Sequence, residues 1–312
     1  MGKKTKRVVK PGVLIHCYQR TQNGVLLFYS ISDYLVYFTI YSVNARRYGI
    51  KVLSLNLMPD HVHESVMVSK SNVLSRFKRK VNSSFAKVHN EVCHTSGQLF
   101  EEPFGSALKH GDKAERTNLI YVGNNPVERK LSKRAEDYQW GFIPYSQTPN
   151  PFSRRLVIRE SRWPLRKAVK EVKLAFKAGR PMTYGQLQRL FKPLELEEKK
   201  QLTDFIVNTY NVIDYQAAIN RFGSYEKMVM AMHSTTGSEH DIQETFTGKS
   251  DEYYARMISI VLRETGEDDV HNVLSYDNDR KWQMFQLLRQ KTFATSRQIA
   301  KFLRMPLEVR EI

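Results

Sequence analysis

The sequence contains little cysteine and no long apolar run. Only two cysteines occur among the 312 residues. This number excludes a disulfide framework and is typical of a reducing cytoplasm. No apolar run approaches 18 residues, so a membrane-spanning helix is not expected. His89, Cys93 and His94 lie close together without a second ligand cluster, which favours an ordinary polar helix end over a zinc site.

Acidic residues are also scarce relative to basic ones. The chain has 32 Asp and Glu against 49 Lys and Arg, a net charge of +17. Charge of this size bears on partners and not on fold, and nucleic acid is the simplest polyanionic partner. A membrane surface is the competing interpretation, but no long basic amphipathic stretch stands out. The basic residues 1–7 lack a following apolar segment, so they are not a secretion signal. We expect a cytoplasmic, nucleoid-associated protein.

Periodic patterns divide the chain into two parts. Strands are predicted over 13–20, 50–57 and 61–68, and helices over 32–47, 71–92 and 114–131, with a short extended piece before the last helix. This order predicts an α+β fold, an antiparallel sheet with packed helices of the HUH/RRM-like kind, over residues 1–150. Residues 144–151 are rich in Pro, Ser, Thr and Asn and predict a linker.

The second part, residues 151–312, is predicted to be an all-helical accessory domain, with DNA binding as one role. Helices are expected over 163–178, 183–191, 195–209, 213–222, 250–265 and 280–303. Residues 295–303 resemble the first helix of a helix-turn-helix. The remaining residues 306–312 are short for a recognition helix, so a plain packing helix is equally favoured.

Two histidines one residue apart form the first candidate site feature. On a strand, His61 and His63 project from one face together with Ser65, because side chains alternate along an extended chain. Two neutral imidazoles suit a divalent ion such as Mg²⁺, Mn²⁺ or Zn²⁺. The spacing alone is a weak signal, since chance histidine pairs at a surface or in a core are common.

A tyrosine and an asparagine four residues apart form the second feature. On a helix, Tyr121 and Asn125 lie on the same side one turn apart. The Asn125 amide oxygen could complete a three-ligand set with two imidazoles, next to a hydroxyl nucleophile. The alternatives are a Tyr121 ring packed in a core and a turn-forming Asn125, since a residue before Pro126 avoids helical geometry. Together the features predict a DNA-cutting site.

These motifs resemble those of a known family. Residues 56–63 look like the "LMPNHVH" signature of REP-associated tyrosine transposases, a branch of the single-tyrosine HUH superfamily. Residues 121–127 resemble the family's "YIHxNPV" segment, and residues 137–140 resemble its "DYxWSS" tail. The similarity runs from about Val13 to Tyr145 in order and at familiar spacings.

The resemblance implies a function and a role for each matched residue. His61 and His63 would be metal ligands, Asn125 a third ligand and Tyr121 the nucleophile. The family implies a metal-dependent enzyme, loaded with Mg²⁺ or Mn²⁺, that cleaves and rejoins single-stranded DNA near palindromic hairpins. The reaction would pass through a covalent 5′-phosphotyrosine. The oligomeric state, monomer or homodimer, stays open.

Cationic side chains would hold the DNA. Single strands are usually bound in a cationic groove with stacking aromatics. Basic side chains at the end of the first strand and in one cluster of helix 71–92 are candidates, although that cluster could equally be a solvated helix face. The candidates are Arg20, Arg76, Lys78, Arg79 and Lys80, with the basic residues of 3–7 as a flexible arm.

The sequence departs from the family pattern at three places. Glu64 stands where an apolar residue is usual. Gly123-Asn124 and Gly141-Phe142 replace the usual pairs in the other two motifs, and Gly123 could make the tyrosine helix mobile. No catalytic group is lost by these changes.

The sequence leaves two alternatives to this function, one non-enzymatic and one enzymatic. A domesticated DNA-binding protein would keep the fold without cutting. A metal-dependent hydrolase would need further histidines on later strands, but His233, His240 and His271 fall in helical or loop patterns.

Overall fold

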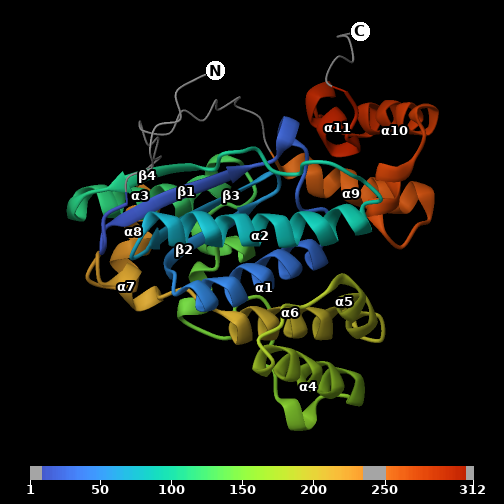
Figure 1. Ribbon diagram of the computed structural model, residues 1–312. Coiled ribbons are helices and arrows are strands. Elements are labelled where there is room, and N and C mark those ends of the chain that lie inside the picture. The colour runs from blue at the N-terminus through green and yellow to red at the C-terminus, as the bar shows by residue number, and fades with distance from the viewer. Residues whose placement is uncertain (1–8, 235–250, 307–312) are drawn as a thin grey trace.

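A computed structural model describes residues 9–234 and 251–306. The chain is a mixed α+β protein with a four-stranded antiparallel sheet in its N-terminal half and a helical C-terminal half, which confirms the predicted fold class (Figure 1). The strands lie in the order β2-β3-β1-β4. In the part of the chain described, no helix is long and apolar enough to cross a membrane.

The N-terminal half follows the predicted order of elements. They are β1 (Leu14–Arg20), α1 (Ile31–Tyr48), β2 (Lys51–Met58), β3 (His61–Met67), α2 (Ser71–Val92), β4 (Gly105–Lys109) and α3 (Gly111–Glu128). Helix α1 begins at a capping box between Ser30 and Asp33 and ends at Gly49, whose φ of 63° lies in the left-handed region. Residues 135–146 form short 3₁₀ turns.

The C-terminal half contains one helix that the sequence patterns missed and one break. Its helices are α4 (Trp163–Lys177), α5 (Tyr184–Phe191), α6 (Leu196–Tyr210), α7 (Tyr215–Ile219), α8 (Tyr225–Ser234), α9 (Glu252–Thr265), α10 (Asn278–Lys291) and α11 (Ser296–Leu303). Helix α8 was not predicted. The helix expected over 280–303 is two helices, because Thr295 and Gln298 form a capping box that starts α11. Ile299 and Phe302 of α11 are buried, and residues 307–312 lie outside the described chain.

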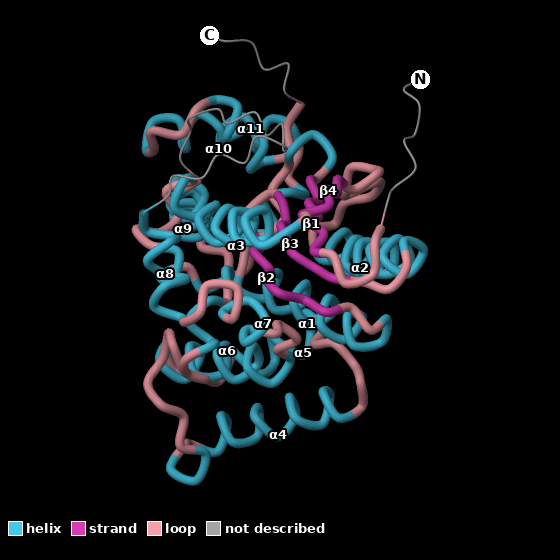
Figure 2. Tube along the Cα trace, turned by 90° about the vertical axis from the view of Figure 1, so that its left-hand side faces the viewer, coloured by secondary structure: helices cyan, strands magenta, loops and turns pink. Residues whose placement is uncertain are grey.

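The sheet is covered on both faces. Helices α1 and α2 pack on one face and α3 on the other, so that the sheet lies between α3 and α2 in Figure 2. The antiparallel register places Tyr18 opposite His63 and Arg20 opposite His61. Side chains opposite one another share a face, so these four residues all point toward α3.

The core continues beyond the predicted linker. Val172 of α4 and Ile206 of α6 belong to the same buried cluster as Val62 of β3. Ile213 forms a parallel bridge with Val52, and the Asp214 amide donates to the Val52 carbonyl at 2.8 Å. This segment covers the outer edge of β2, which would otherwise be open to pairing. A domain division at residue 150 stays a prediction.

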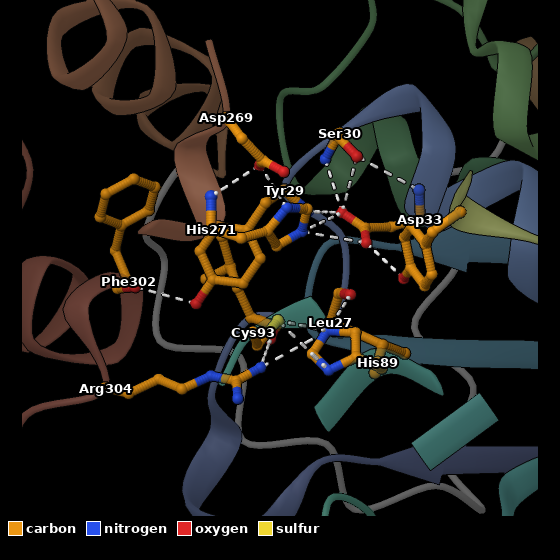
Figure 3. Close-up of polar contacts among 12 residues, drawn as sticks. Leu27, Tyr29, Ser30, Asp33, His89, Cys93, Asp269, His271, Phe302 and Arg304 are labelled. Carbon is orange, nitrogen blue, oxygen red and sulfur yellow. Dashed lines mark hydrogen bonds and ion pairs between the residues drawn. The ribbon is translucent and has the colours of Figure 1, made fainter. Parts of the chain in front are cut away.

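A buried polar cluster joins the last helices to α1 (Figure 3). The Asp33 carboxylate accepts from the Tyr29 and Ser30 amides and lies 3.0 Å from His271 Nε2. Burial lowers the pKa of His271, but Asp33 and Asp269 outweigh it and raise that pKa to about 10. Although burial raises the pKa of Asp33, His271 holds it well below its usual range. The charged pair therefore persists at neutral pH.

Candidate active site on the α3 face of the sheet

The two predicted histidine ligands lie side by side on β3. The ring centroids of His61 and His63 are 4.8 Å apart and their planes are perpendicular. Both side chains are buried. Strand alternation thus brings two imidazoles together on the α3 face, as the spacing predicts.

A carboxylate orients the first imidazole. His61 Nδ1 lies 2.5 Å from Asp60 Oδ1, so Nε2 is the nitrogen that can face an ion. Burial raises the pKa of Asp60, but His61, Lys301 and Arg129 outweigh it and hold that pKa at about 2. An ionised carboxylate behind an imidazole is the usual outer partner of a metal-binding histidine.

A second histidine, not predicted as a site residue, orients the other imidazole. His16 Nε2 lies 3.0 Å from His63 Nδ1, and His16 Nδ1 lies 2.7 Å from the Asn118 amide of α3. Ser65 Oγ donates to Asn118 Oδ1 at 2.7 Å. The sequence held one signal for His16: strand alternation places it on the same face as Tyr18.

The structure brings Tyr121 to the same place. Its ring centroid is 5.5 Å from that of His63 and 5.6 Å from that of His16. The phenol thus lies beside the imidazoles. The Tyr121 side chain is only 5% exposed, so it is covered. Tyr121 and the histidines therefore lie together, as the sequence predicts, but they are buried.

Helix α3 runs through Pro126 without the break considered at Asn125. Proline has no N–H, so the carbonyl of Val122, four residues earlier, loses its helical donor. The Asn56 side chain of β2 supplies the missing donor, at 2.6 Å from that carbonyl. Asn56 lies opposite His63 in the register, so this bond ties the turn that carries Tyr121 to the histidine strand.

The Asn125 amide faces the second imidazole. Its Nδ2 is 3.4 Å from His63 Nε2, while its buried Oδ1 has no hydrogen-bond partner among the described residues. A half-turn of the amide exchanges these two atoms and directs Oδ1 toward His63 Nε2. Among residues 9–234 and 251–306, no three His, Cys, Asp or Glu side chains are placed to hold a metal. Two imidazoles and one amide oxygen fit a divalent ion that takes its remaining ligands from water and phosphate.

Gly123 and Asn124, which differ from the family motif, contact α8. Asn124 Nδ2 donates to the Met232 carbonyl at 2.6 Å. A Cβ on Gly123 would lie 2.7 Å from Met232 Cε. Gly123 thus permits a close approach of α8 to α3. A mobile tyrosine helix stays a prediction.

Glu64, which stands where the family motif has an apolar residue, pairs with a residue of α2. Its carboxylate lies 2.6 Å from Lys78 Nζ, and both side chains are almost fully buried on the α2 face. Lys78 therefore cannot contact phosphate, and its assignment to DNA binding was wrong. The physical reason is that a buried charge needs a paired opposite charge.

The other predicted DNA contacts fall in two places. Arg20 lies opposite His61 on the site face, where its guanidinium stacks over Tyr18 at 5.4 Å. Arg76, Arg79 and Lys80 are exposed on α2, on the far side of the sheet from Tyr121. The basic residues 3–7 lie outside the described chain.

The C-terminal half reaches the edge of the site. The Asp251 amide, just before α9, donates to the Arg129 carbonyl at 2.9 Å. Lys301 Nζ of α11 is 3.9 Å from Asp60 Oδ2, next to His61. Burial and the Asp60 carboxylate raise the pKa of Asp251 to about 6. These contacts connect the accessory helices to the histidine strand.

The later histidines are placed away from the site. His233 lies 2.9 Å from Glu136, and His271 pairs with Asp33. His240 lies outside the described residues. The arrangement that a metal-dependent hydrolase needs is not formed by His233 or His271.

Comparisons with known proteins give one distant match. No protein-family model matches the chain, and no curated protein matches it. Among solved structures, a REP-associated tyrosine transposase bound to a REP hairpin is similar, with 15% identity and a TM-score of 0.39. The match covers 45% of this chain and 82% of that chain. Similarity at this level carries no functional conclusion, so function has to be argued from the site.

Proposed function

We propose that the protein is a metal-dependent, single-tyrosine HUH endonuclease and strand transferase acting on single-stranded DNA near palindromic hairpins. The observation that carries the proposal is the convergence of Tyr121 with the His61–His63 pair on one face of the sheet. The motif resemblance supports the same roles. His61, His63 and the Asn125 amide oxygen would hold Mg²⁺ or Mn²⁺.

Tyr121 would act as the nucleophile. Its hydroxyl would lose a proton as the oxygen bonds to a backbone phosphorus, and the bond between that phosphorus and the 3′ oxygen would break. The products would be a tyrosyl phosphate at the 5′ end and a free 3′-hydroxyl, whose oxygen has taken up a proton. A divalent ion held by His61, His63 and Asn125 would supply charge stabilisation to the reacting phosphate. Asp60 and His16 orient the two imidazoles, and Asn56 fixes the helical turn that carries the phenol. The 3′-hydroxyl of another strand reverses the reaction and rejoins DNA.

The closed site sets a condition on this reaction. Tyr121 and both histidines are buried, so a phosphodiester can reach them only after covering elements move. The contacts of Asp251 and Lys301 place parts of the C-terminal half at the edge of the site. Cleavage would therefore depend on separation of these contacts.

The same burial favours a second candidate. A DNA-binding protein of this fold that no longer cuts would keep Tyr121 covered and would keep His63 in contact with His16 and Asn125. Both ring nitrogens of His63 have such contacts here. The two functions differ in whether a covalent protein–DNA bond forms.

The test is a covalent-adduct assay with the full chain. Single-stranded oligonucleotides that contain hairpins with flanking single strands, labelled at the 3′ end, are incubated with Mg²⁺ or Mn²⁺ and resolved under denaturing conditions. An adduct lost with chelator and in Tyr121→Phe supports the enzyme. Tyr18→Phe, which removes a hydroxyl from the same sheet face, is the matched control and should retain the adduct. Tight binding without any adduct would favour the non-cutting protein.

A further inference from the structure

Helix α4 and the residues around it carry a dense set of basic side chains. Residues 154–180 contain ten Lys and Arg but only two acidic residues. All ten basic side chains are exposed. The ten are Arg154, Arg155, Arg159, Arg162, Arg166, Lys167, Lys170, Lys173, Lys177 and Arg180.

The charges gather on the outward side of α4. Leu165, Val169 and Val172 are buried toward the core, where α4 packs on α6. Arg166, Lys170, Lys173 and Lys177 follow one another at steps of three or four residues and form one exposed row along the helix. Lys173 lies at the margin of this row, with its Nζ 5.8 Å from the ring centroid of Phe205 in α6. From Trp163 to Lys177 the helix runs about 21 Å at 1.5 Å per residue.

Most of these charges lack acidic partners. Within the described residues, Arg162 pairs with Glu195 and Glu198, and Arg159 lies 3.4 Å from Glu160. Arg166, Lys170, Lys173 and Lys177 take part in no ion pair with described residues. The outward side of α4 therefore presents uncompensated positive charge.

This surface is separate from the candidate active site. In Figure 1, α4 lies at the bottom of the molecule, beyond α6, and α1 lies between α6 and the sheet. Figure 2 shows the same order of layers. A ligand on α4 would thus bind without touching Tyr121 or the histidines.

We propose that the outward side of α4 binds the phosphate backbone of duplex nucleic acid without sequence preference. A duplex carries about one negative charge per 1.7 Å of its axis, so a cationic row of about 16 Å from Arg166 to Lys177 has several phosphates within reach. A membrane surface fits less well, because a membrane-bound helix inserts a continuous apolar side, and here that side is packed in the core. The exposed large apolar side chains of α4, Trp163 and Leu174, are eleven residues apart and do not form such a side. This binding is independent of the proposed cleavage reaction.

The test measures binding of the full chain to a blunt 20-base-pair duplex of arbitrary sequence by fluorescence anisotropy, between 50 and 200 mM salt. The test variant combines Arg166→Gln, Lys170→Gln and Lys173→Gln. The control combines Lys192→Gln, Lys200→Gln and Arg256→Gln, three exposed cations on other elements. Circular dichroism checks that both remain folded.

We expect the test variant to bind at least tenfold more weakly at 100 mM salt. The slope of log K against log salt should fall by about 2 to 3, since each phosphate contact contributes about 0.9. The control should bind like the parent protein, and Tyr121→Phe should bind the duplex normally. Equal binding by the test and control variants would overturn the proposal. Binding of the parent to phosphatidylserine vesicles but not to duplex would also overturn it.

Discussion

The two faces of the sheet are both buried, but they bury different chemistry. The face under α1 and α2 is apolar, with residues such as Val62 and Val66 in the main core, and it holds the Glu64–Lys78 ion pair. The face under α3 holds imidazoles and amides that contact one another or the helix backbone.

This difference shows that a buried polar group does not by itself mark a site. The charges of Glu64 and Lys78 compensate each other, and both side chains are buried in the core. On the α3 face, groups of metal-ligand type converge on a side chain that can act as a nucleophile. The account therefore predicts that substitutions on the first face change stability alone, and that substitutions on the second change chemistry.

The largest effect on stability is expected from Lys78→Met. It leaves the Glu64 carboxylate buried without its partner, which costs about 3–5 kcal/mol of unfolding free energy. Urea denaturation measures the loss. The double variant Glu64→Leu with Lys78→Met should recover to within about 1 kcal/mol of the parent. Parent-like stability of Lys78→Met alone would contradict the pairing.

The largest effect on chemistry is expected from His61→Ala. Loss of one ligand should slow adduct formation about 100-fold or more, equivalent to about 3 kcal/mol. Isothermal titration calorimetry should show weakened Mn²⁺ binding. His94→Ala, at an exposed histidine away from the site, is the control and should leave both quantities unchanged. Undiminished Mn²⁺ affinity in His61→Ala would remove this residue from the ligand set.

Asn56→Leu is expected to have a smaller effect on both the unfolding free energy and the rate of adduct formation. The Val122 carbonyl then has neither its helical donor nor the side-chain donor, which costs about 1–3 kcal/mol of unfolding free energy. The loosened turn should also slow adduct formation about tenfold.

Asn44→Leu is the matched control for Asn56. Asn44 is buried on α1 and donates to the Ile40 carbonyl at 2.8 Å, on the other side of the sheet. The Ile40 carbonyl keeps its helical N–H donor in this variant, so unfolding free energy should fall by less than in Asn56→Leu, and the adduct rate per folded molecule should be unchanged. Equal slowing in both variants would mean that Asn56 acts only through global stability.

The smallest effect concerns pH. His271, with its pKa raised to about 10, adds stability that is full below about pH 6.5 and is lost as pH rises toward 10. Burial, opposed by Asp33, lowers the pKa of His89 to about 3. The contribution of neutral His89 to the unfolding free energy is therefore full above about pH 6.5 and is lost as pH falls toward 3. Unfolding free energy should therefore peak near pH 6.5.

The His271 contribution can be isolated in one variant. Between pH 7 and 9 the parent should lose about 1 kcal/mol of unfolding free energy for each pH unit. His271→Gln should be less stable at pH 7 and should lose less over this range. Parallel pH profiles for the two proteins would contradict the raised pKa.

Periodic elements could be predicted from the sequence because their signals are local. Helix α2 occupies the predicted range 71–92, since Leu74, Phe77, Val81 and Phe85 repeat at helical spacing. The alternation of β3 sufficed to place His61 and His63 on one face.

Features that depend on tertiary partners could not be predicted in this way. Helix α3 continues through Pro126 because Asn56, distant in sequence, donates to the freed carbonyl. Lys78 was misassigned although a signal existed: it lies four residues after Leu74 and three before Val81, on the inward side of α2. Only the pairing with Glu64 explains why a lysine is tolerated there.

The most direct test of the account is to identify the residue that carries the DNA. A covalent complex formed with a hairpin oligonucleotide and Mn²⁺ is digested with nuclease and trypsin and analysed by mass spectrometry. The account predicts a nucleotide phosphate on Tyr121, within peptide 117–129. A phosphate on the peptide that contains Tyr18, or strand cleavage with no modified tyrosine, would contradict it.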